Sequence, residues 1–134
     1  LGAEIDLWRV SIKPGKPFLF GTAGPCCIFG LPGNPVSAFV TFLKFVRPAL
    51  MKMSGAAEEH WGLPAVAAQL AAAVMNEGDR PHYLRGRVHD GVFSVLGRQE
   101  SHALFGLSRA NALLRAAPGS KFAAGENVMV EYWD

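Results

Sequence analysis

The chain has 134 residues, of which 50% are apolar, and its formal net charge is +2. This composition excludes a disordered chain and fits a globular protein of one domain or two small ones. No apolar run reaches the ~18 residues of a membrane-spanning helix, and no dense lysine and arginine run indicates nucleic-acid binding. No signal peptide is recognisable, and the two cysteines, Cys26 and Cys27, are adjacent, which predicts free thiols in the cytoplasm.

The first part of the chain predicts short strands joined by a stiff loop. Alternation of polar and apolar residues predicts a strand over residues 5–12, and short apolar runs predict strands over residues 18–21 and 26–29. The uninterrupted apolar run at 26–29 is typical of a sheet covered on both faces. Two prolines and a glycine exclude a regular element from residues 13–17, which are therefore predicted to form a loop.

A long helix is predicted from residue 35 to residue 53. Asn34 is a good N-cap, and Pro35 suits the first helical position because its missing N–H needs no partner there. Apolar side chains cover a wide arc of this helix, which predicts more than one buried surface. Pro48 predicts a kink, and Gly55 predicts the end of the helix.

The second half consists of short segments separated by turn signals. The Asp90-Gly91 pair predicts a hairpin, and strand spacing near ten residues predicts a small β-barrel or sandwich. Residues 65–74 are alanine-rich, which favours a helix, but their neighbourhood favours a strand. The strands predicted here cover residues 65–74, 82–89, 92–96, 112–116 and 128–133.

The turn that leads into the helix is the first candidate for chemistry. Gly30 and Gly33 permit a tight turn, and a helix N-terminus with free N–H groups is an anion site. Lys13 and Lys16 could direct two ammonium groups at phosphates, and residues 1–55 carry a net charge of +4. The alternatives are a solvated loop for the lysines and a simple capped turn for Asn34.

The second half offers fewer candidates. Arg85 and Arg87 are two residues apart on a predicted strand, so they would project from one face as an anion clamp or as a solvated face. The histidines have no metal-ligand spacing, so the sequence predicts no metal site of its own; they are His60, His82, His89 and His102.

Two motifs in this order resemble the molybdopterin molybdenumtransferase family, the group of MoeA and the gephyrin E-domain. They are residues 11–17 (SIKPGKP) and residues 29–38 (FGLPGNPVSA). Residues 1–8 and 46–50 also look like that family. The second half is similar more loosely, at residues 84–86, 101–102 and 108–111.

The resemblance implies an α/β plus all-β fold. Residues 1–58 would be the C-terminal part of a molybdopterin-binding α/β domain, and residues 62–134 a small C-terminal β-barrel domain. The family inserts molybdate into adenylylated molybdopterin with Mg²⁺ and releases AMP. It acts as a homodimer, with molybdopterin adenylyltransferase as its pathway partner. The alternatives are a gephyrin-like scaffold that binds a partner peptide between the two domains, and a plain β-module for protein association.

Site residues follow from the motifs. Lys13 and Lys16 would be the catalytic residues at an anion-binding loop. The family's acidic residues for Mg²⁺ would lie upstream of Leu1, so the chain is expected to be a fragment that is inactive alone, and prone to dimerise or aggregate through an exposed apolar edge. The substrate-binding residues would be Pro32, Gly33, Asn34, Pro35, Ser37, Arg85 and Ser101.

Overall fold

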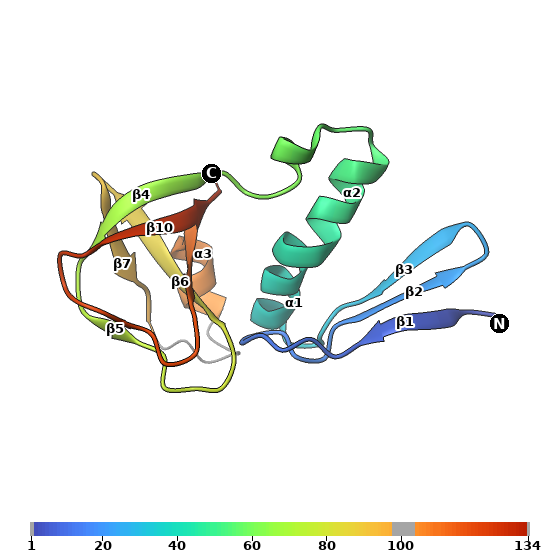
Figure 1. The fold of residues 1–134 in the computed structure, drawn as a ribbon, viewed down its shortest axis with the longest axis horizontal. Helices are drawn as coiled ribbons and strands as arrows, with labels where there is room; N and C mark the ends of the chain where they lie inside the picture. The colour runs from blue at the N-terminus through green and yellow to red at the C-terminus, as the bar shows by residue number, and fades with distance from the viewer. Residues whose placement is uncertain (1, 98–103, 134) are drawn as a thin grey trace. The chain divides into compact units, whose positions relative to one another are not determined.

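A computed structural model of the chain describes residues 2–97 and 104–133. The chain divides into two compact units, Leu1–Gly62 and Leu63–Asp134, and each is described by itself (Figure 1). The first unit combines a sheet with a helix, and the second is built around a closed barrel. This arrangement confirms the predicted α/β plus all-β fold class.

Three antiparallel strands form the sheet of the first unit, in the order β1-β2-β3. They are β1 (Glu4–Trp8), β2 (Leu19–Ala23) and β3 (Cys26–Gly30). β1 is shorter than predicted because Arg9 has a φ of 68°, and its N–H turns to the carbonyl of Phe18. The prediction that β3 is covered on both faces is wrong, because residues 26–28 are exposed along the sheet edge. Both cysteines are free, as predicted.

The predicted helix is present and begins at Pro35. It consists of α1 (Pro35–Thr41), a π-helical turn η1 (Phe42–Val46) and α2 (Arg47–Met53). In the π-helical turn, the Arg47 N–H donates to the carbonyl of Phe42, five residues back. This wider turn comes directly before Pro48, whose ring would crowd the carbonyl one turn back in a regular α-helix.

The helix ends as predicted. Gly55 has a φ of +81°, its N–H donates to Lys52, and the Ala56 N–H donates to Met51. These two bonds are those of a Schellman motif, which requires the left-handed conformation that glycine adopts readily. Beyond it lies the short 3₁₀ helix η2 (Glu58–His60). Among the helices of residues 2–97 and 104–133, none is long and apolar enough to cross a membrane.

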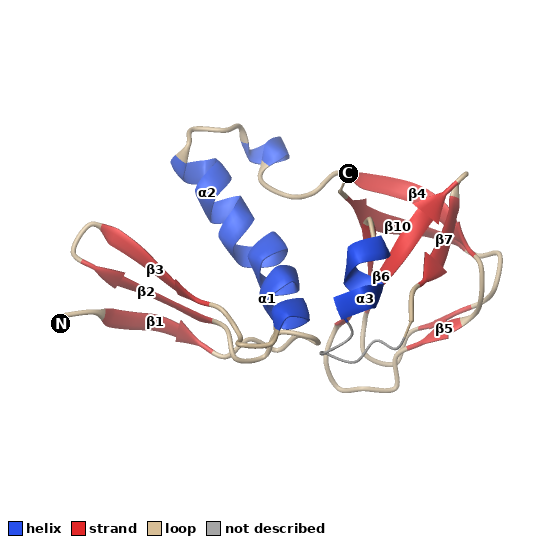
Figure 2. Cartoon of the chain, turned by 180° about the vertical axis from the view of Figure 1, so that it is seen from behind, coloured by secondary structure: helices blue, strands red, loops and turns tan. Residues whose placement is uncertain are grey.

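The second unit contains a closed barrel with the strand order β10-β4-β7-β6-β8, and a two-stranded sheet of β5 and β9 (Figures 1 and 2). β4 pairs antiparallel with β10 and parallel with β7. The helix α3 (Leu104–Arg109) packs beside β6 (Figure 2). The strands are β4 (Ala65–Leu70), β5 (Val74–Met75), β6 (His82–His89), β7 (Val92–Val95), β8 (Ala112–Ala116), β9 (Lys121–Phe122) and β10 (Asn127–Tyr132).

The predicted strands agree closely with this barrel. β6 and β8 have the predicted bounds, and the hairpin turn lies at Asp90-Gly91, with φ values of 49° and 74°. The strand predicted over residues 65–74 breaks after Leu70, and its last residue belongs to β5. Inward-facing side chains fill the barrel: Ala68, Leu70, Leu84, Phe93, Ala112, Leu114, Ala116, Val128 and Val130.

Candidate functional site

The loop that carries Lys13 and Lys16 is closed at its base by two backbone hydrogen bonds. The Arg9 N–H donates to Phe18 over 2.9 Å, and the Val10 N–H donates to Lys16 over 2.9 Å. Pro14 and Gly15 are buried within the loop, whereas both lysines are exposed. The two exposed ammonium groups therefore extend from a loop whose backbone is held at its base by these hydrogen bonds.

Gly15 allows this loop to pack closely against α1. Its φ is +118°, and a Cβ added there would overlap Thr41 Cγ2 and lie 3.2 Å from Ile12 Cδ1. Only glycine fits both the dihedral angle and the space. Thr41 lies six residues after Pro35, which is about 9 Å along the helix axis. The lysine loop therefore contacts the last residue of α1, one to two turns along the same helix from its start.

The start of α1 is capped as the sequence predicted. The Asn34 Oδ1 accepts hydrogen bonds from the N–H groups of Val36 and Ser37, at 3.1 and 3.2 Å. Pro35 has no N–H to offer. The expectation of free N–H groups at this helix start is therefore wrong for its first three residues, because Asn34 already satisfies the two that exist.

The turn before the helix still has an accessible side. Gly33 is exposed, and the space where its Cβ would lie is open. Pro35 is exposed too, whereas Pro32 and Ser37 are buried. A ligand can therefore approach the backbone at Gly33, while Pro32 and Ser37 support the turn from within. Binding at these residues stays a prediction.

Replacing Asn34 with alanine should lower the free energy of unfolding of the first unit by about 1 kcal/mol, because two N–H groups lose their acceptor. Asn34→Ser keeps a capping oxygen and should cost less than about 0.5 kcal/mol. Urea denaturation of the three proteins measures both values. Equal losses in the two variants, or a loss below about 0.3 kcal/mol in the alanine variant, would contradict the role of this cap.

In the second unit, Arg85 and Arg87 differ in environment. Arg85 lies on β6 opposite Leu113 of β8 and is 1% exposed, whereas Arg87 is exposed. Burial lowers the pKa of the Arg85 guanidinium by desolvation. The described residues therefore do not form the predicted clamp of two solvent-facing guanidinium groups. Ser101, the other predicted substrate-binding residue of this unit, lies outside the described residues.

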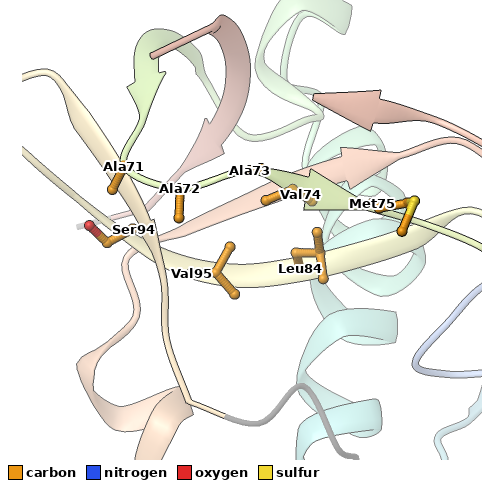
Figure 3. A pocket seen from close by; sticks show the side chains of 8 residues that line it. All are labelled: Ala71, Ala72, Ala73, Val74, Met75, Leu84, Ser94 and Val95. Carbon is orange, nitrogen blue, oxygen red and sulfur yellow. The ribbon is translucent and has the colours of Figure 1, made fainter. Parts of the chain in front are cut away.

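Each unit has an apolar pocket away from the predicted site residues. The pocket of the first unit, about 280 Å³, lies between the sheet and the helix and includes Lys44. The pocket of the second unit, about 290 Å³, is lined by alanine and other apolar side chains, with Ser94 at one end (Figure 3). None of the residues that line it is titratable, so this pocket offers apolar binding and no acid–base chemistry. Its lining residues are Ala71, Ala72, Ala73, Val74, Met75, Leu84, Ser94 and Val95.

The side-chain contacts of two asparagines in the second unit, one buried and one half-buried, were missed in the sequence. The Asn76 side-chain amide donates to the carbonyls of Arg80, Ala116 and Ala117. The Asn111 amide exchanges two hydrogen bonds with the Val88 backbone, at 2.7 and 3.1 Å, as a paired strand residue would. Asparagine is common in turns and loops, so nothing in the sequence indicated that these two side chains hydrogen-bond to the backbone of the second unit.

Comparisons with known proteins match both units. The family model described as MoeA C-terminal region (domain IV) matches residues 67–133, and the one described as probable molybdopterin binding domain matches residues 1–52. A molybdopterin molybdenumtransferase of Haemophilus influenzae is 33% identical over 135 residues, which cover 96% of the chain and 33% of that protein. A gephyrin of Dictyostelium discoideum is 36% identical, over 82% of the chain and 19% of that protein.

A solved structure agrees with these matches. A molybdopterin biosynthesis moeA protein from Pyrococcus horikoshii superposes with a TM-score of 0.80 at 29% identity, over 96% of the chain and 32% of that protein. The chain spans about one third of the length of the curated molybdopterin molybdenumtransferases that it matches.

Proposed function

Because the chain belongs to the MoeA/gephyrin family of molybdopterin molybdenumtransferases, we propose that it forms part of an enzyme of molybdenum cofactor biosynthesis. The reaction we propose for that enzyme is the insertion of molybdate into adenylylated molybdopterin, with release of AMP. Both molybdate and adenylylated molybdopterin are substrates and carry negative charge. The chain would contribute to the site that holds them.

The observation that carries this proposal is the closed loop with two exposed lysines. Its backbone is fixed by the bonds at Arg9 and Val10 and by the close contact of Gly15 with Thr41. A held backbone limits where the two ammonium groups can reach, and such cations offset charge at the phosphoanhydride as it breaks. The family matches at residues 1–52 support the same assignment.

The remaining residues have supporting roles in the proposal. Gly33 would admit a phosphate close to the backbone, while Asn34, Pro35 and the buried Pro32 and Ser37 would keep the turn in shape. Arg85 and Ser101 stay in the proposal as substrate-binding residues on the family resemblance alone, and the burial of Arg85 gives no support to its part. A homodimer, molybdopterin adenylyltransferase as pathway partner and a cytoplasmic location are further parts of the proposal that the family resemblance supplies.

Mg²⁺ is an implied component for which the described residues offer no site. Within residues 2–97 and 104–133, no group of three or more His, Cys, Asp or Glu side chains could hold a metal ion. We therefore assign no step of the proposed reaction to a metal held by this part of the chain.

We expect Lys13→Ala and Lys16→Ala each to weaken AMP binding about tenfold, because each removes a charge-assisted hydrogen bond to phosphate. Calorimetric titration of the chain with AMP measures the dissociation constants. Lys121→Ala is the matched control, since it removes an exposed lysine from β9. The loss should shrink as the salt concentration rises, because screening weakens exposed charge pairs.

Two outcomes would contradict this proposal. One is a wild-type affinity for AMP in the Lys13→Ala and Lys16→Ala variants, and the other is an equal loss in Lys121→Ala. A chain that ignores AMP but binds an apolar peptide, with or without the two lysines, would favour the gephyrin-like scaffold instead.

A further inference from the structure

The connector between the two units is hydrogen-bonded to α2 through the side chain of Arg47. Arg47 Nη1 donates to the carbonyl of Trp61 over 2.6 Å and to the carbonyl of Gly62 over 2.7 Å. The His60 carbonyl lies 3.4 Å from the same nitrogen. These carbonyls follow the last turn of η2, where the partial charge is negative and a guanidinium is favourable.

Trp61 adds one contact within the connector and one to the C-terminal end of α2. Its Nε1 donates to the carbonyl of Ala56 over 2.9 Å, and Lys52 Nζ lies 5.2 Å from the centre of its ring. Lys52 and Arg47 both belong to α2. Residues 56–62 are therefore folded back onto α2, although their mixed polar sequence is typical of a free linker.

On the other side, the second unit begins immediately. The Tyr132 N–H donates to the carbonyl of Pro64 over 2.8 Å, and Ala65 already pairs with Glu131 of β10. The carbonyl of Gly62 is thus held by the first unit, and the carbonyl of Pro64 by the second. Between these two fixed points lies one residue, Leu63.

We propose that Leu63 is the hinge between the two units, and that Arg47 is a latch that keeps the hinge one residue long. The torsions left free are φ and ψ of Leu63, because the held Gly62 carbonyl fixes ψ of Gly62 and the proline ring fixes φ of Pro64. Leu63 is itself restricted to extended conformations because it precedes a proline. Without Arg47, the carbonyls of Trp61 and Gly62 lose their donor, and the flexible stretch extends back through η2.

Backbone NMR relaxation of the wild-type chain tests the hinge. We expect order parameters near 0.85 for residues 58–62, as in α2, and a minimum at Leu63. In Arg47→Met, which keeps the apolar stem and removes the donors, values for residues 58–62 should fall below about 0.6. Arg115→Met, an exposed arginine on β8, is the matched control and should change nothing in the connector.

Proteolysis with an enzyme that cuts after glutamate provides a second readout. Cleavage after Glu58 and Glu59 should be about tenfold faster in Arg47→Met, whereas cleavage after Glu77 should keep its wild-type rate. Low order parameters throughout residues 58–62 in the wild type would overturn the proposal, and that result does not depend on any variant folding. Unchanged cleavage and unchanged order parameters in Arg47→Met would overturn the role of the latch.

Discussion

Replacement of Gly86 with alanine is expected to destabilise the barrel by about 3 kcal/mol, at the upper end of overpacking costs. A Cβ at this position would overlap the ring of Phe93 and lie 2.6 Å from the carbonyl oxygen of Ser94. Phe93 is fully buried, and Ser94 belongs to the partner strand β7, so neither can move aside cheaply. Amide hydrogen exchange of β6 and β8 measures the loss.

Two variants separate this overlap from a general effect of alanine. Gly106→Ala lies in α3, where the added Cβ would be 3.4 Å from the nearest atom, and should be neutral or stabilising. Phe93→Leu should reduce the additional cost of Gly86→Ala, because a smaller side chain relieves the ring overlap but not the carbonyl contact. If Gly86→Ala costs no more than Gly106→Ala, the packing described for this strand pair is wrong.

Most of the barrel strands could be predicted from local signals, because each of these strands is marked by a pattern of a few neighbouring residues. Asp90-Gly91 adopts the two positive φ values of a tight hairpin, so the bounds of the strands around it could be predicted from the sequence. The closing of the barrel depends on β10 pairing with β4, some 60 residues earlier, and no local pattern encodes such a pairing. Recognition of the family motifs is what decided between a barrel and a sandwich.

The elements missed in the sequence are short or overridden by their surroundings. α3 has six residues and contains Gly106, so its helical propensity is poor and its apolar period too brief to detect. β9 has two residues. The π-helical turn before Pro48 has no sequence signature beyond the proline itself, from which only a kink was predicted.

In the candidate site too, features that depend on adjacent residues were predicted, and features that depend on distant strands were not. The cap at Asn34 and the loop at residues 13–17 depend on adjacent residues, and both were predicted correctly. Asn34 accepts hydrogen bonds from the N–H groups that the prediction of an open anion site had left free. The burial of Arg85 depends on strand partners such as Leu113, so its environment could not be read from the spacing of two arginines.

Asn76→Ala should lower the stability of the second unit by about 3 kcal/mol. Asn76 is 4% exposed, and its amide nitrogen serves three carbonyls at 2.9 to 3.1 Å while its oxygen accepts from the Gly78 N–H. Alanine removes these four bonds in a buried region. The Ala117 carbonyl keeps its donors from Ser120, so the loss is less than the sum of four buried groups at about 1–3 kcal/mol each. Urea denaturation and hydrogen exchange of β8 measure the change.

Asn76→Asp is the sharper test, because it keeps the shape and changes only the donor. A carboxylate would face three carbonyl oxygens, which raises the pKa of the new carboxyl group above its ordinary value. The folded state then binds a proton more tightly than the unfolded state, so the loss relative to the wild type is greatest at pH 7. The loss should shrink as the pH falls toward 4, where the protonated group again donates a hydrogen bond.

The control for the two Asn76 variants is Asn127, an exposed asparagine at the start of β10. Asn127→Asp should stay within about 0.5 kcal/mol of the wild type at both pH values, because its side chain remains in water. An Asn76→Asp variant whose loss grows on acidification would mean that the new carboxylate is accepted in its charged form. The three carbonyls would then not surround the side chain, and the junction of β5, β8 and β9 would have to be described differently.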